Sequence, residues 1–161
     1  MMAGFLRPAA GALAWLGAPI EADLASHRRQ LCYLGHADAV KGVLTVRENL
    51  ALAVALSRGA ADRIDEALDR FDLAALAQTP ARYLSAGQRR RLALARLLTG
   101  RRPLWLLDEP GVGLDAANRQ HLEQVIAAHR AAGGMVALAT HGDTTISNAL
   151  ELELGVEDRD G

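Results

Sequence analysis

The most restrictive feature of this 161-residue sequence is the stretch from residue 83 to residue 110. Ser85 stands where a helix N-cap is expected, directly before a run of strong helix formers. After a Gly-Arg-Arg-Pro break, a short apolar run ends in Asp108 and Glu109. Such a run predicts a buried parallel strand whose acids lie at the carboxyl edge, where open α/β sheets bind ligands. A helix start that suits an anion, followed by this strand, is typical of a nucleotide triphosphatase.

Four short motifs in and around this stretch resemble those of the ABC-type ATPases. Leu84-Ser85-Ala86-Gly87-Gln88 is similar to the family's signature motif, with Ala86 where glycine is commoner. Residues 104–109 resemble the Walker B strand, residues 113–115 the D-loop, and Thr140-His141 the switch histidine. Several motifs in the family's order carry more weight than one alone, and they outweigh the alternative of a generic amphipathic helix before a core strand.

This resemblance implies the fold class and its divisions. We expect an α/β fold of the P-loop NTPase type, with a mostly parallel sheet core and an inserted helical subdomain, lacking the N-terminal Walker A portion. Residues 1–161 are interpreted as a single, partial ABC ATPase domain. The expected parts are a core segment with the Q-loop region at 1–44, a helical subdomain ending in the signature helix at 45–98, and a core with the Walker B, D-loop and switch-histidine motifs at 99–161.

The sequence lacks one motif that the ABC ATPase interpretation requires, the phosphate loop with its lysine. Lys41 is the only lysine and is followed by Gly-Val, so the phosphate-loop pattern Gly-x-x-x-x-Gly-Lys-Ser/Thr does not occur. ABC ATPases need that loop because its amides and lysine hold the nucleotide phosphates. Residues 1–8 are interpreted as a helix tail, and residues 11–20 resemble the segment downstream of the phosphate-loop helix. We therefore expect the sequence to begin after that loop, and to be inactive alone.

The N-terminus has a rival interpretation as a secretory signal, because Arg7 precedes an Ala- and Leu-rich run. Pro8, Gly11, Gly17 and Pro19 interrupt that run, and the cleavage pattern is poor. No stretch reaches the ~20 apolar residues needed to span a bilayer. Any membrane role is therefore expected to come through a partner.

Charge and cysteine content narrow the function classes further. A net charge of −1 gives no electrostatic reason to expect nucleic-acid binding. The single cysteine, Cys32, excludes an internal disulfide and fits a reducing compartment. DNA-repair ATPases share the signature motif, but the long heptad repeats that they need are absent from the sequence.

The resemblance implies roles for the strand-end residues. Asp108 is expected to hold Mg²⁺ and Glu109 to act as the catalytic base, since attack of water on a γ-phosphate needs both a metal and a water-activating group. His141 is expected to contact the γ-phosphate and orient the water. The alternative is a pair of solvated loop carboxylates, which the preceding apolar residues and Pro110 disfavour.

Other motif residues are expected to act across a dimer, in which two copies sandwich two ATP molecules. Asp115 would reach across the interface. The residues expected to serve the nucleotide of the second subunit are Ser85, Ala86, Gly87 and Gln88. ATP and Mg²⁺ are the implied cofactors. The implied partners are a second ATP-binding subunit and a membrane permease, which would hold the chain at the cytoplasmic face of the inner membrane.

The loop from Gly35 to Lys41 narrows the resemblance. Gly35-His36, a lysine five residues after His36, and then Leu-Thr-x-x-Glu-Asn-Leu resemble the ATP-binding subunit of the haem exporter of cytochrome c maturation. A glutamine usually occupies the position of His36, contacting metal and water, so His36 is a candidate nucleotide-site residue. Thr45 and Glu48 also predict a capping box. The alternatives are an ATPase subunit of another ABC exporter, and a non-hydrolysing fragment or interaction module.

The remaining basic side chains on the predicted helices are interpreted as solvated. His121 and His129 are expected at the surface of the helix that follows Asp115. The signature helix is made basic by Arg89, Arg90, Arg91 and Arg96. A solvated face is likewise expected for these arginines, except for Arg89 nearest the N-cap, for which phosphate contact stays open.

Overall fold

The computed structural model describes residues 1–57, 59–140, 146 and 148–152. At its centre, within these residues, lies a three-stranded parallel sheet in the order β3 (Leu31–Leu34), β4 (Leu104–Asp108) and β5 (Met135–Ala139). Leu104 pairs with Leu31 on one side and with Met135 on the other, so the strands begin level with one another. Their carboxyl ends therefore share one edge, and the predicted α/β fold with a parallel sheet is confirmed.

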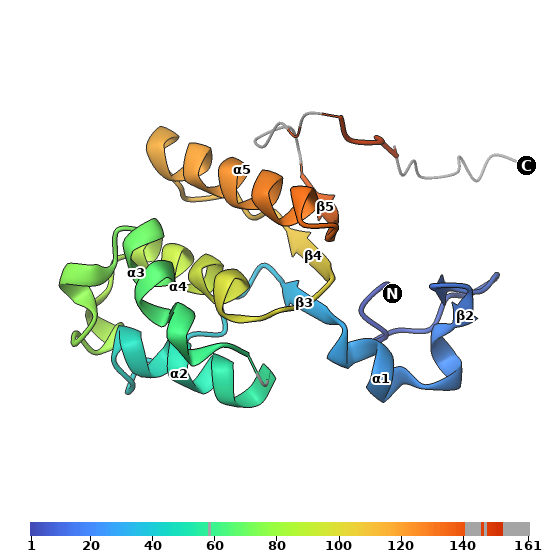
Figure 1. The fold of residues 1–161 in the computed structure, drawn as a ribbon, viewed down its shortest axis with the longest axis horizontal. Coiled ribbons are helices and arrows are strands. Elements are labelled where there is room, and N and C mark those ends of the chain that lie inside the picture. The colour runs from blue at the N-terminus through green and yellow to red at the C-terminus, as the bar shows by residue number, and fades with distance from the viewer. Residues whose placement is uncertain (58, 141–145, 147, 153–161) are drawn as a thin grey trace, which may run out of the picture.

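Three helices pack against one another on one side of the sheet (Figure 1). They are α2 (Val46–Ser57), α3 (Ile64–Arg70) and α4 (Ala86–Thr99), joined through short 3₁₀ turns at Ala61–Arg63, Ala74–Leu76 and Ala81–Tyr83. The helix α4 also contacts β3 and α5 (Ala116–Ala131), and α5 in turn contacts β5. No helix within the described residues is long and apolar enough to cross a membrane.

The two faces of the sheet are buried to different extents. Trp105 and Leu107 of β4 belong to a large apolar cluster shared with α2, α3, α4 and α5. On the opposite face, Leu104 and Leu106 form a small cluster with Ala3, against which Trp15 is only partly buried. The main core therefore lies between the sheet and the helices.

The predicted capping box of Thr45 and Glu48 and the predicted N-cap at Ser85 are both confirmed. The Thr45 hydroxyl accepts a hydrogen bond from the Glu48 N–H at 3.1 Å, and the Glu48 carboxylate accepts one from the Thr45 N–H at 2.8 Å. Ser85 and Gln88 make the same reciprocal pair at the start of α4. Each box satisfies amide groups that a helix start leaves without intrahelical partners, which fixes where α2 and α4 begin.

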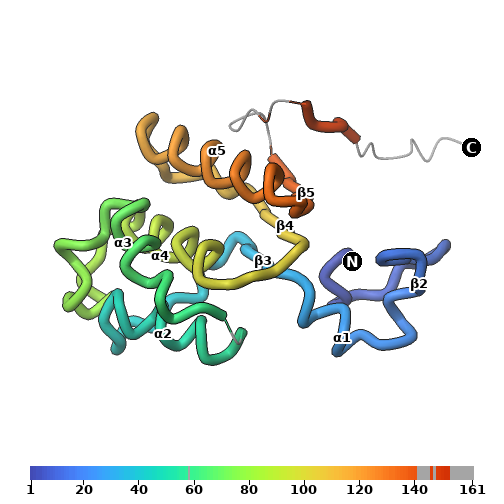
Figure 2. Tube along the Cα trace, viewed as in Figure 1, coloured from blue at the N-terminus to red at the C-terminus, as the bar shows by residue number. Residues whose placement is uncertain are grey.

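The N-terminal segment lies apart from the helices α2 to α4, on the right of Figures 1 and 2. It contains the hairpin β1 (Ala14–Trp15) and β2 (Ala18–Pro19), a 3₁₀ turn at Ile20–Ala22, and α1 (Leu24–Arg29). The interpretation of residues 1–8 as a helix tail is wrong. Gly4 adopts a left-handed φ of 72°, and its N–H closes a tight turn onto the Met1 carbonyl at 2.7 Å.

The end of α5 packs against the amino end of β4. Gly133 follows the C-cap residue Ala132 and adopts a left-handed φ of 86°, the conformation in which a glycine commonly ends a helix. His129 stacks on Trp105 with ring centroids 3.8 Å apart and an angle of 4° between the planes. The expectation that His129 is a surface residue is therefore wrong, because the indole of β4 covers one face of its ring.

Candidate functional site

The predicted acids lie at the carboxyl edge of the sheet. Asp108 ends β4 and pairs with Ala139 of β5, and the Glu109 N–H donates to the Ala139 carbonyl at 2.9 Å. Both acids are half-buried. The backbone hydrogen bonding between β4 and β5 thus continues one residue beyond Asp108. The N–H group of Glu109 is therefore bonded to the sheet.

The backbone of Glu109 is strained. Its φ of 46° lies in the left-handed region, which residues with a Cβ rarely adopt. The next residue, Pro110, is fully buried, and a residue before proline normally takes an extended conformation. Such a conformation costs on the order of 1–3 kcal/mol and persists only where surrounding contacts hold it.

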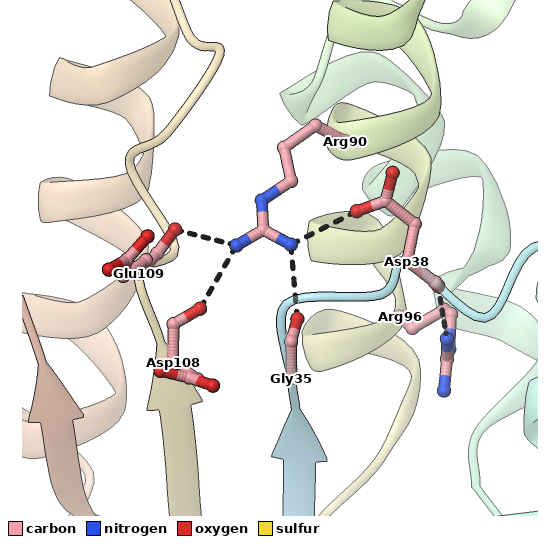
Figure 3. Close-up of polar contacts among 6 residues, drawn as sticks. All are labelled: Gly35, Asp38, Arg90, Arg96, Asp108 and Glu109. Atoms are coloured by element: carbon pink, nitrogen blue, oxygen red, sulfur yellow. Dashed lines mark hydrogen bonds and ion pairs between the residues drawn. The ribbon is translucent and has the colours of Figure 1, made fainter.

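A buried arginine of α4 supplies part of these contacts. Arg90 is only 6% exposed, and its two terminal nitrogens donate to four oxygens at the sheet edge (Figure 3). One nitrogen donates to the Asp108 carbonyl at 3.1 Å and the Glu109 carbonyl at 2.6 Å. The other donates to the Gly35 carbonyl at 3.3 Å and the Asp38 carboxylate at 3.0 Å. The interpretation of Arg90 as part of a solvated face is therefore wrong.

The loop after β3 carries the other half of this network. Arg96 donates to the Asp38 carbonyl at 3.0 Å, so two arginines of α4 hold one loop residue. Further along, the amide of buried Asn49 bonds both the N–H and the carbonyl of Lys41, at 2.8 and 3.0 Å. The loop is thus fixed to α4 at one end and to α2 at the other. His36 lies within it, with its side chain exposed.

The start of α4 presents open donors. The Ser85 hydroxyl accepts from the Gln88 N–H at 3.2 Å, and a hydroxyl in that role still has its own proton to donate. The N–H groups of Ala86 and Gly87 bond no group among the described residues. A helix start with free amides and the positive end of the helix dipole favours a bound phosphate.

A close backbone approach favours glycine at position 87. A Cβ there would lie 3.3 Å from the Gly113 carbonyl oxygen, so the first turn of α4 packs against the loop that leads into α5. In that loop Asp115 caps α5, accepting from the backbone N–H of Asn118 at 2.8 Å and from its side-chain amide at 2.9 Å. These two hydrogen bonds lower the pKa of the Asp115 carboxyl, because they favour its charged form.

The predicted residues therefore fall into two groups that α4 connects. The first turn of α4 holds Ser85 to Gln88, close to the loop of Asp115, and the second turn holds Arg90, which bonds the main chain of Asp108 and Glu109. His141 lies outside the described residues. Sequence reasoning missed Arg90, Asp38 and Asn49. Only Asn49 had a usable signal, as a polar residue inside the apolar pattern of a capped helix.

The acids at the sheet edge suit an Mg²⁺ ion that is also bound by a nucleotide. Among the described residues, no group of three or more histidine, cysteine, aspartate or glutamate side chains could hold a metal by itself. Mg²⁺ in nucleotide sites is typically bound through one or two carboxylates, substrate phosphates and water. The carboxylate of Asp108 fits that donor set, so it suits a metal that arrives with a nucleotide.

A parallel sheet with two acids and a phosphate-suited helix start at its carboxyl edge defines an α/β nucleotide-binding class. The family model for ABC transporters matches residues 1–112. The chain is 52% identical over 158 residues to the cytochrome c biogenesis ATP-binding export protein CcmA of Paramagnetospirillum magneticum, covering 96% of this chain and 73% of that protein. Against CcmA of Rhodospirillum rubrum it is 50% identical over 154 residues, covering 96% and 66%. The chain belongs to the ABC transporter family.

Solved structures agree with this assignment. The structure of an ATP-binding subunit of an ABC transporter superposes with a TM-score of 0.76 at 25% identity, covering 87% of this chain and 60% of that one. The ATP-binding cassette MJ0796, solved as a dimer in a post-hydrolysis state with ADP and Pi, gives a TM-score of 0.75 at 25% identity, covering 86% and 66%. The chain thus spans about 60 to 66% of the length of these two structures.

Proposed function

We propose that this chain is the ATP-binding and ATP-hydrolysing part of an ABC transporter that energises haem export for cytochrome c biogenesis. The observation that carries the proposal is the 52% identity to a CcmA protein over 96% of the chain. The site supports it, since two strand-end acids and a helix start with free amides lie at one edge of the sheet. The loop with Gly35-His36 and Lys41 favours the haem-export branch.

In the proposed reaction, the chain's own groups position a water molecule and a phosphate. Glu109 is the general base that takes the proton of the attacking water, and His141 orients that water against the γ-phosphate. Asp108 holds Mg²⁺, which neutralises charge on the phosphate oxygens when it is bound. The exposed His36 adds a hydrogen-bonding group to the same edge. Phosphoryl transfer depends mostly on such positioning and electrostatic stabilisation.

The signature residues act on the nucleotide of a second copy. The free N–H groups of Ala86 and Gly87 and the hydroxyl proton of Ser85 are donors for phosphate oxygens, while Gln88 holds Ser85 in place. Asp115 faces the same partner from the start of α5. A dimer that sandwiches two nucleotides uses all of these donors, whereas a single copy leaves them facing solvent.

The transporter also needs a membrane partner. The proposed division places the core at 1–44 and 99–161 and a helical subdomain at 45–98, which is the part that contacts a multi-span permease. That permease holds the subunit at the cytoplasmic face of the inner membrane.

Complementation tests the proposal. A phosphate-loop segment from the P. magneticum relative is fused ahead of residue 1, and this chimera is expressed in a P. magneticum strain from which CcmA has been deleted. Restored c-type cytochromes, together with ATPase activity of the purified chimera, support the proposal. Residues 1–161 alone serve as the baseline, for which we expect no turnover.

The same experiment separates the alternatives. A chimera that hydrolyses ATP but restores no cytochrome c identifies an ATPase subunit of another exporter. A folded chimera that binds no ATP and has no turnover identifies a non-hydrolysing interaction module. Either result contradicts the proposed function.

A further inference from the structure

We infer that Arg90 is a positioning residue that locks the signature helix α4 to the carboxyl ends of β3 and β4 and thereby fixes the backbone of Glu109. The lock itself is a property of the fold. Its catalytic consequence rests on the proposed function, in which Glu109 is the base.

The geometry of the guanidinium group suits this role. Its two terminal nitrogens point to opposite sides, one to the carbonyls of Asp108 and Glu109 and the other to Gly35 and Asp38 (Figure 3). A planar fork can bridge two loops in this way, whereas a lysine ammonium concentrates its donors at one point. The contact therefore depends on arginine and not only on positive charge.

Charge and burial make the contact hard to replace. The side chain of Arg90 is 7% exposed and that of its carboxylate partner Asp38 is 26% exposed. An ion pair removed from water interacts strongly, and the loss of one partner leaves an uncompensated buried charge. Besides this carboxylate, the acceptors are three main-chain carbonyls, so Arg90 holds backbone and not merely side chains.

Strained backbone lies on both sides of the arginine. Within the described residues, Glu109 and Ala39 are two of the non-glycine residues with a left-handed φ, at 46° and 51°. Glu109 is bonded by Arg90 directly, and Ala39 follows Asp38, whose carboxylate Arg90 binds. Such conformations persist where neighbouring contacts over-determine them, and Arg90 supplies those contacts at both places.

A mechanical consequence follows for the proposed dimer. The start of α4, which serves one nucleotide, and Glu109, which serves the other, belong to one rigid unit. When a phosphate binds at Ser85, any shift of α4 is passed to the Glu109 backbone through Arg90. The side chain of Arg90 thus couples the start of α4 to the backbone of Glu109 within one subunit.

The lock is tested first on residues 1–161, by NMR measurement of amide hydrogen exchange in Arg90→Gln and Arg90→Lys. The reporters are the N–H groups of Glu109, Val112 and Leu114, which bond to Ala139, Glu109 and Gly111 respectively. We expect each to exchange at least about tenfold faster in both variants, since local opening needs less free energy once the fork is lost. Full protection in Arg90→Lys would show that charge alone suffices and would overturn the inference.

The matched control is Arg91→Gln. Arg91 lies on the same helix and donates to the carbonyls of Phe71 and Asp72 at 3.0 and 3.3 Å, away from the sheet edge. If Arg90 merely stabilises α4, the two glutamine variants will alter the reporter amides equally, which contradicts a lock. Should Arg90→Gln fail to fold, Asp38→Asn provides a milder variant. It should speed exchange at Lys41 and Glu109, and unchanged protection at both would also overturn the inference.

The catalytic consequence is tested in the chimera with the phosphate loop. Arg90→Lys should lower kcat about 10²-fold, because small misplacements of a catalytic group are that costly. The KM for ATP should change less than about twofold, since the phosphate loop is untouched. An unchanged kcat with faster amide exchange would overturn the positioning role. A wild-type chimera without ATPase activity would contradict the proposed function, while the exchange data would still decide whether the lock exists.

Discussion

The two ends of the parallel sheet are built on different principles. At the carboxyl end, the chain places the acids Asp108 and Glu109, a left-handed residue before a proline, and a buried arginine that bonds main-chain oxygens. At the amino end, Trp105 stacks on His129, and Gly134 leaves room for that ring. One end concentrates charge and strain, and the other consists of close packing with ordinary backbone hydrogen bonds.

This difference separates the effects that substitutions should have. Backbone strain and charge near a ligand edge favour chemistry at the expense of stability, whereas close packing contributes stability alone. Changes at the carboxyl end should therefore alter turnover more than folding. Changes at the amino end should alter folding and leave the turnover of each folded molecule the same.

The largest expected effect is at Glu109. In the chimera, Glu109→Gln should retain ATP binding and lose about 10²–10⁴-fold in turnover, which is the usual cost of removing a general base. The unfolding midpoint in urea should stay within the range of ordinary surface substitutions. Steady-state hydrolysis and urea unfolding measure the two quantities.

Glu21→Gln is the matched control for this prediction. Glu21 is an exposed acid in the N-terminal segment, far along the chain from the sheet edge. The Glu21→Gln substitution should change neither the turnover nor the urea midpoint of unfolding. Hydrolysis by Glu109→Gln at the wild-type rate would show that another group is the base.

The next effect concerns the start of α4. Ser85→Arg in the chimera removes a donor and fills the space in front of the free amides of Ala86 and Gly87. The loss of charge-assisted hydrogen bonds should weaken ATP-dependent dimerisation about 10–100-fold. Light scattering with and without ATP measures this. If the variant formed ATP-dependent dimers at the same protein concentration as the wild type, this result would argue against the sandwich arrangement.

The carboxyl edge was only partly predictable from sequence. Adjacent acids after an apolar run and a serine before helix formers have local signals, so the positions of Asp108 and Glu109 at the strand end and of Ser85 at the helix start were predicted. Arg90 lies between two other arginines and has no local signal. Arg90 is buried because it lies on the face of α4 that packs against the loop of Asp38, which is 52 residues earlier in the chain.

The amino end was less predictable for a related reason. His129 occupies a helix position that reads as polar, and its burial depends on where Trp105 of β4 meets α5. Contacts between distant segments decide both cases, and helix periodicity does not encode them. The roles assigned to all the candidate site residues remain predictions.

At the amino end, Gly134→Ala should destabilise the fold and spare the chemistry. A Cβ at this position would lie 2.2 Å from the His129 ring, so that ring would have to shift out of its stack on Trp105. Overpacking of this kind typically costs about 1–3 kcal/mol. Urea unfolding measures the loss. In a His129→Ala background the same substitution should cost little, and an equal cost in both backgrounds would show that the clash is not with this ring.

The smallest effect is a pH dependence at His129. Burial lowers the pKa of its imidazole, because desolvation disfavours the charged form. The unfolded chain therefore binds the proton first as pH falls, so the stability contributed by neutral His129 is present above about pH 6.5 and is lost below it. The pKa of the Asp115 carboxyl is lowered from a value of 3.8, so its effect belongs to a more acidic range. Unfolding free energy measured from pH 7.5 to pH 5 should fall less in His129→Phe, which keeps an aromatic stack without a titrating group. An equal fall in the variant and the wild type would assign the pH dependence to other groups. Titration of His129 would then not be one of the differences between the two ends of the sheet.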